Sequence, residues 1–108
     1  MPRFSCPYLG ADVELTEARE RHIAARHPDL YEEHWSRVAE TIADPDQVRR
    51  SARDPSTRLF TRWFAAVEGG KYVIAVVVAD TGTGRHWLST AYIARRLSKG
   101  VQVEWQRN

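Results

Sequence analysis

The sequence predicts a single α+β domain, residues 1–108, in which two N-terminal helices pack on a four- to five-stranded antiparallel sheet. Three observations support this prediction. The length of 108 residues is close to the commonest domain size. Apolar residues recur at helical spacing before residue 44 and alternate with a period of two after residue 46. Hydrophobic residues make up 43% and charged residues 28% of the chain, proportions that exclude a disordered or fibrous protein.

The first part of the chain contains a short strand and two helices. Residues 13–15 alternate as in a strand, and Thr16 follows as a suitable N-cap for a helix over 17–26. Pro28 disfavours helical backbone at the residue before it, so this helix should end there. Apolar side chains at helical spacing then predict one second helix over residues 30–43.

The rest of the chain reads as an antiparallel meander. Residues 47–53 form a polar strand, which is plausible only at a sheet edge. Residues 58–67 alternate, whereas residues 72–79 are apolar on both faces and predict the central strand. A strand over 86–93 follows, and residues 101–105 form either a last strand or an extended segment.

Composition places the protein in the cytoplasm, with no membrane association. The longest apolar run, residues 73–79, is far too short to cross a bilayer, and the first residues do not resemble a signal peptide. A single cysteine, Cys6, excludes an internal disulfide. We therefore expect a cytoplasmic protein.

Charge is distributed unevenly along the chain. Residues 1–46 hold five Lys and Arg against ten Asp and Glu, whereas residues 47–108 hold eleven against four. Fourteen of the sixteen cationic residues are arginines, whose planar guanidinium suits phosphate. The asymmetry indicates either a nucleic acid or acidic partner, or simply solvated faces in an arginine-rich chain.

The histidines do not form a metal motif. His22, His27, His34 and His86 make no i,i+4 pair, no cysteine accompanies them, and no clustered carboxylates occur. We expect neither a metal nor another cofactor. His22 and His27 lie five residues apart, roughly 140° around a helix, so at most one should point straight into a cleft.

The residues nevertheless suit metal-free cleavage of RNA, which carries its own nucleophile in the 2′-hydroxyl. Such a reaction needs a base, an acid and a cation near the phosphate. His22 and His27 can transfer protons near neutral pH, Arg62 can hold the phosphate, and the hydroxyls of Thr90 and Tyr92 can position it.

Strand alternation assigns faces to these groups. His86, Leu88, Thr90 and Tyr92 should share one face of their strand, with Trp87, Ser89 and Ala91 on the other. Arg62 alternates with Phe60 and Phe64 on a partly buried face, so it either binds phosphate or pairs with a helix carboxylate such as Glu20.

Several short strings, in this order, resemble small phage-associated nuclease domains of the barnase–EndoU–colicin–RelE fold group. The resemblance spans nearly the whole chain. The family's Gly-x-x-x-Trp ending corresponds to Gly100 and Trp105, which are separated here by four residues. The other matching strings are Val13-Glu14-Leu15-Thr16, Arg21-His22-Ile23, Arg26-His27-Pro28, Ala43-Asp44-Pro45-Asp46, the strand of Arg62, and Ser89-Thr90-Ala91-Tyr92.

The resemblance implies a metal-independent endoribonuclease, often toxin-like or phage-related, with a RelE- or barnase-like fold. It implies RNA, either tRNA or mRNA, as substrate. The uneven charge allows a third interpretation, in which the protein is one half of a complex and its acidic helices or basic sheet dock a cognate inhibitor protein. By the resemblance His22 and His27 are the acid and base, in either order, Arg62 is the phosphate cation, and Thr90 and Tyr92 contact phosphate or base. We assign further substrate contacts to Arg49, Arg58, Ser89 and His86.

Each assignment has a structural alternative. His27 can complement the dipole at a helix end, His22 can be an ordinary surface residue, and Thr90 and Tyr92 can be simple strand formers. The alternative function is a non-catalytic module of the same fold that binds RNA or protein through its arginines.

Overall fold

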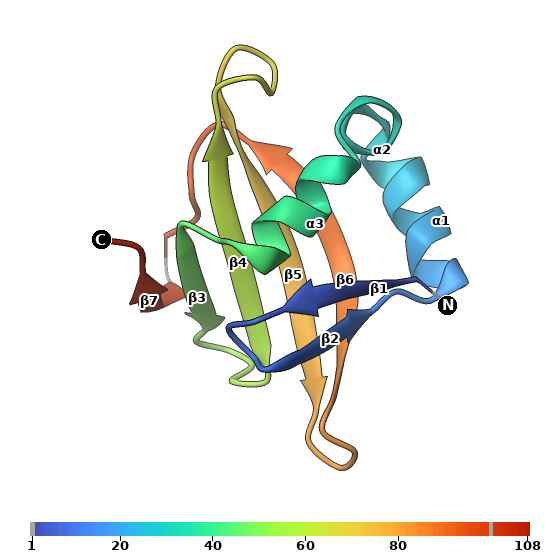
Figure 1. Ribbon diagram of the computed structural model, residues 1–108, viewed down its shortest axis with the longest axis vertical. Helices are drawn as coiled ribbons and strands as arrows, with labels where there is room; N and C mark the ends of the chain where they lie inside the picture. Colours follow the sequence, from blue (N-terminus) through green and yellow to red (C-terminus); the bar gives the residue numbers. More distant parts are fainter. Residues whose placement is uncertain (1, 100) are drawn as a thin grey trace.

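The computed structural model describes residues 2–99 and 101–108. In these residues the chain forms one seven-stranded sheet and three short helices (Figure 1). None of the described helices is long and apolar enough to cross a membrane. The strands are β1 (Arg3–Cys6), β2 (Ala11–Glu14), β3 (Gln47–Ser51), β4 (Thr57–Phe64), β5 (Lys71–Asp80), β6 (Arg85–Ala94) and β7 (Val101–Gln106); the helices are α1 (Glu17–Arg26), α2 (Pro28–Glu33) and α3 (Ser36–Ala43).

The strand order across the sheet is β1-β2-β6-β5-β4-β3-β7, so the apolar strand β5 is central, as predicted. Neighbouring strands are antiparallel except β2 and β6, which run parallel. That parallel pairing is short, with Val13 opposite His86 and Glu14 opposite Trp87. Beyond Trp87, no described strand pairs with this edge of β6, and α1 packs there instead.

The core lies between strands β3 to β6 and a cover made of α3 and the β1–β2 hairpin, which crosses the same face as α3 (Figure 1). Tyr8, in the hairpin turn, contacts the rings of Phe60 and Trp105 at centroid distances of 6.0 Å each. Burial of each large apolar side chain contributes about 1.5–3 kcal/mol to folding. The largest buried apolar side chains are Phe60, Leu15, Ile23, Leu30, Ile42, Ile74 and Leu88.

The predicted fold class is wrong. Instead of two helices on four or five antiparallel strands, the described residues form three helices and a mixed sheet of seven strands. The unpredicted strand β1 has only four residues, too few for a clear periodic signal. The parallel β2–β6 pair joins residues 73 positions apart, and no local pattern encodes such a contact.

The predicted single helix over residues 30–43 is divided at His34, where φ is −131° and ψ is 22°. Its apolar residues keep one helical spacing throughout, so periodicity alone does not reveal the break. The two pieces pack on different partners: α2 contacts α1 and β6, whereas α3 contacts β1, β4 and β5. One straight helix would not follow the curved surface of the sheet.

Strand β3 is not at the edge, contrary to prediction, because β7 pairs with its outer side. The polar character of β3 is accommodated by partners on and near β7. Arg50 forms an ion pair with Glu104 at 2.6 Å, and Arg49 donates to the carbonyl of Ser98 at 2.8 Å. These arginines therefore join β3 to the C-terminal part of the chain.

Candidate functional site

An open cleft lies between the C-terminal half of α1 and β6. Its volume is about 450 Å³. We call it the histidine cleft; it is lined by His22, Arg26, His27, Thr90 and Tyr92. Four of these five residues are the ones that the sequence analysis assigned to proton transfer and phosphate positioning.

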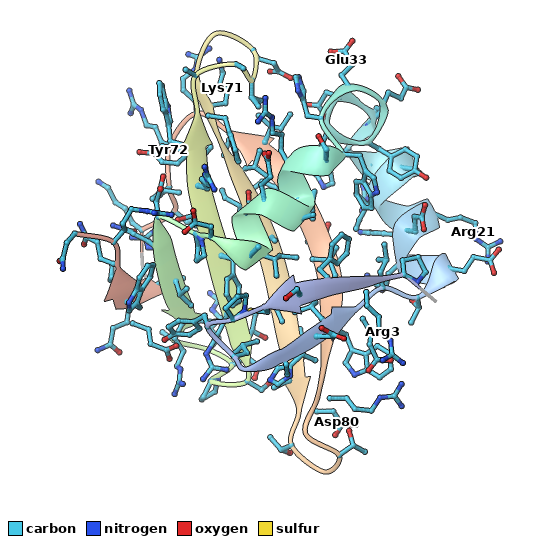
Figure 2. All side chains as sticks on the ribbon, in the orientation of Figure 1. Arg3, Arg21, Glu33, Lys71, Tyr72 and Asp80 are labelled. Atoms are coloured by element: carbon cyan, nitrogen blue, oxygen red, sulfur yellow. The ribbon has the colours of Figure 1, made fainter. Side chains whose placement is uncertain are left out.

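Helix α1 supplies the cationic wall of the cleft. Thr16 caps the helix by accepting a hydrogen bond from the Arg19 backbone N–H at 3.2 Å. His22 and Arg26 are four residues apart and therefore lie on one side of the helix. Arg21 points away from the sheet instead (Figure 2).

His27 lies at the end of α1 and leaves helical geometry, with φ −134° and ψ 62°, because Pro28 follows it. Its backbone N–H still donates to the Ile23 carbonyl at 2.8 Å. The expected separation of roughly 140° between His22 and His27 applies only to a continuous helix. Both imidazoles consequently line the same cleft.

Strand β6 supplies the hydroxyl wall through a β-bulge at Ser89. Val76 pairs with Thr90 while the next residue of β5, Val77, pairs with Leu88, so Ser89 is the additional residue. The bulge reverses the alternation that the sequence analysis assumed. Leu88 packs in the core with Ala91, whereas Thr90 and Tyr92 join Trp87 on the opposite face; the predicted shared face of His86, Leu88, Thr90 and Tyr92 is therefore wrong.

One ring contact and one buried hydroxyl define the interior of the cleft. The ring of His27 lies 5.8 Å from that of Tyr92, centroid to centroid, with an angle of 35° between the planes. The Thr90 hydroxyl oxygen is buried, and no described protein group bonds to it. Buried polar atoms without partners are rare in folded proteins, and a bound water or ligand is one explanation for them.

Arg62 is not part of the histidine cleft. It lies on the face of β4 that α3 covers, with its guanidinium 5.0 Å from the Phe64 ring centroid. It donates to the backbone carbonyl of Asp44 at 3.1 Å and to the carboxylate of Asp44 at 3.4 Å. Glu20, named above as a partner for Arg62, instead accepts a hydrogen bond from the Tyr31 hydroxyl at 2.6 Å.

The guanidinium in the cleft is that of Arg26, which the sequence analysis passed over. Its signal was present in the sequence, because Arg26 follows His22 by one helical turn and precedes His27 directly. The side chain of Arg26 is exposed, which leaves it accessible to an anion from solution.

The four assigned substrate contacts lie in different places. Arg58 pairs with Glu104 at 2.9 Å, and Arg49 is bound to Ser98, three strands away from β6. His86 is half-buried in the β2–β6 pairing and does not line the cleft. Ser89 alone adjoins the cleft, and its carbonyl accepts a hydrogen bond from Arg19 at 3.3 Å.

The histidine cleft combines proton-transfer groups with a fixed positive charge. Two imidazoles can serve as base and acid, and a guanidinium can neutralise a phosphate. Its lining contains no carboxylate or thiol, and no group of three metal-ligating side chains occurs in residues 2–99 and 101–108. No protein-family model, curated protein or solved structure matches the chain.

Proposed function

We propose that this protein is an endoribonuclease that cleaves RNA without a metal ion, by attack of the 2′-hydroxyl on the adjacent phosphate. The observation that carries the proposal is the presence of His22, His27 and Arg26 in one open cleft, opposite the hydroxyls of Thr90 and Tyr92. Acid, base and cation are the three groups that this reaction requires.

In the proposed reaction, one imidazole removes the proton from the 2′-hydroxyl, and the oxygen forms a bond to phosphorus. The bond from phosphorus to the 5′-oxygen breaks, and the second imidazole, in its protonated form, gives that oxygen a proton. The products are a 2′,3′-cyclic phosphate and a free 5′-hydroxyl. Arg26 stabilises the charge on the phosphorane, while Thr90 and Tyr92 donate hydrogen bonds to its non-bridging oxygens.

The resemblance of the His22 and His27 strings to phage-associated nuclease domains supports the same proposal. It extends the proposal to a toxin-like or phage-related role, acting on tRNA or mRNA in the cytoplasm under the control of a cognate inhibitor protein. The contact between His27 and Tyr92 supports a role for Tyr92 in orienting the imidazole.

The test is incubation of the purified protein with total RNA in EDTA, with the products analysed by mass spectrometry. We expect fragments ending in 2′,3′-cyclic phosphate. Each of His22→Ala and His27→Ala should lower the cleavage rate by about 100-fold or more, since general acid–base catalysis contributes on that order. His34→Ala is the matched control, because His34 lies outside the cleft at the end of α2.

Three outcomes would overturn the proposal. RNA that stays intact with the wild-type protein would exclude the activity, and equal rates for the wild type and both histidine variants would exclude the site. Cleavage that appears only when a divalent cation is added would exclude the metal-free reaction. Salt-sensitive RNA binding without cleavage would instead identify the non-catalytic binding module.

A further inference from the structure

A second cavity adjoins the histidine cleft along the same helix and strand. Its volume is also about 450 Å³, and it lies between the N-terminal end of α1 and the first half of β6. We call it the tryptophan cavity; its lining consists of Thr16, Arg19, Val78, Trp87, Leu88 and Ser89. The proposed reaction does not use it.

The two cavities lie next to each other along α1 and β6. Arg19 precedes His22 by three residues on the same side of α1, and Ser89 adjoins Thr90 on β6. A hydrogen bond from Arg19 to the Ser89 carbonyl, 3.3 Å long, links α1 to β6 in the tryptophan cavity. Arginine carries five N–H donors, so others remain for an anion.

The distance along α1 between the two cavities suits a short run of nucleotides. At a rise of about 1.5 Å per residue, Arg19 and Arg26 are separated by roughly 10.5 Å along α1. Three stacked nucleotides of one strand cover about the same length, at about 3.4 Å each. A strand with its scissile phosphate near Arg26 would therefore bring the phosphate three nucleotides away to Arg19.

Trp87 is held in place by an ion pair in which Glu14 is buried and Arg85 is exposed. The guanidinium of Arg85 lies 4.5 Å from the centroid of the Trp87 ring. The two carboxylate oxygens of Glu14 accept hydrogen bonds from Arg85 at 2.8 Å and 2.6 Å, and Glu14 is only 7% exposed. Trp87 itself is half-exposed and lines the cavity. A fixed aromatic ring loses little conformational freedom when a ligand stacks on it.

We propose that the tryptophan cavity binds the base of an unpaired nucleotide within about three nucleotides of the scissile phosphate, stacked against Trp87, while Arg19 binds the backbone. This inference rests on the proposed ribonuclease function and specifies its substrate as single-stranded RNA. The apolar side chain of Val78, which pairs with Trp87 across the sheet, suits the flat face of a base. Thr16 already caps α1, so Ser89 is left as the main hydroxyl for base edges, and selectivity among bases is weak.

Binding is measured with a fluorescently labelled, single-stranded 2′-O-methyl oligonucleotide, which lacks the free 2′-hydroxyl and cannot undergo the proposed reaction. Fluorescence anisotropy then reports affinity independently of catalysis. We expect Trp87→Ala to weaken binding by about tenfold or more and Trp87→Phe to retain most of the affinity, because stacking needs only an aromatic face. Trp63→Ala, at an exposed tryptophan that lines a different cavity, should bind like the wild type.

The salt dependence of binding tests Arg19 separately. Arg19→Ala should lower the slope of log affinity against log salt by about one, the change expected when one phosphate contact is lost. Arg21→Ala removes the same charge from the outward side of α1 and should leave the slope unchanged (Figure 2).

The proposal would be overturned if Trp87→Ala bound the oligonucleotide as tightly as the wild type does. It would also be overturned if Trp63→Ala lost as much affinity as Trp87→Ala, or if the wild type bound fully double-stranded RNA as tightly as single-stranded RNA. If Trp87→Ala does not fold, the Trp87 indole N–H is followed by NMR in the wild-type protein, and no shift on addition of the oligonucleotide overturns the proposal. Trp87-dependent binding without RNA cleavage would refute the ribonuclease and keep the base site. Cleavage together with binding that does not depend on Trp87 would refute the base site and keep the ribonuclease.

Discussion

The imidazole of His27 and the phenol ring of Tyr92 face each other at 5.8 Å, although 65 positions of the chain separate them. Two local backbone irregularities make this contact possible. Pro28 takes His27 out of helical geometry at the end of α1, and the bulge at Ser89 turns Tyr92 to the outer face of β6. The histidine cleft thus forms where a helix lies beside an edge of β6 that no described strand pairs with.

Replacement of Thr90 by valine should separate stability from activity. The hydroxyl is buried and has no described partner, so an isosteric methyl removes a desolvation cost. We expect the free energy of unfolding in urea to stay unchanged or to rise by about 1 kcal/mol. The cleavage rate should fall, because the phosphate loses a donor, and Thr90→Ser should retain activity. A large loss of stability in Thr90→Val would show that the hydroxyl has a structural partner.

The two arginines Arg26 and Arg62 should respond differently to replacement by alanine. Arg26→Ala should lower the cleavage rate by about 100-fold, as for loss of one charge-stabilising donor, with little change in stability. Arg62→Ala should leave cleavage near the wild-type rate and lower stability by about 1 kcal/mol or less, since its pair with Asp44 is partly exposed. Arg21→Ala controls for net charge. The opposite pattern would identify Arg62, and not Arg26, as the cation that binds the phosphate.

The pair of Glu14 and Arg85 should stabilise the fold only above acidic pH. Hydrogen bonds from Arg85 hold the pKa of the Glu14 carboxyl below its usual value. A carboxyl whose folded pKa is lowered adds stability above the unfolded pKa, about 4.3, and loses it as the pH falls through the folded pKa. The difference in melting temperature between wild type and Glu14→Gln should therefore be constant near neutral pH and shrink below about pH 4. A difference that persists at the lowest pH would contradict this account.

Tyr8 should produce an alkaline transition. Partial burial and the hydrogen bond that its hydroxyl donates to Glu104, 2.5 Å long, raise the pKa of Tyr8 to about 12. A group with a raised folded pKa contributes stability below its unfolded pKa, about 10, and loses it as the pH rises through the folded pKa. Absorbance of tyrosinate should show a late step that Tyr8→Phe removes. Above about pH 10 the wild type should lose stability faster than Tyr8→Phe, and parallel loss would exclude the linkage.

Much of the local structure around the site follows from short-range signals. Thr16 caps α1, Pro28 ends it, and the uninterrupted apolar run of β5 marks the central strand; each prediction is confirmed. Such signals act within a few residues, through hydrogen bonds, proline geometry and burial, and are therefore readable without tertiary contacts.

The errors concern contacts between distant segments. β7 covers β3, β2 pairs parallel with β6, and the chain bends at His34 so that α2 and α3 reach different partners. The bulge at Ser89 was likewise not predicted, because the residues around it carry no local signal for an additional residue in the strand. A single inserted residue reverses every following side chain, so strict alternation placed Thr90 on the wrong face.

For the candidate site, residue chemistry was enough to nominate His22, His27, Thr90 and Tyr92, and the folded chain places all four around one cleft. It was not enough to choose among fourteen arginines. Arg62 is bound to Asp44, whereas Arg26 reaches the cleft, and the two differ only in which elements surround them. The chemical type of a side chain can be read from the sequence. Its neighbours depend on how α1 and β6 pack, and that packing is determined by burial of apolar side chains over the whole core.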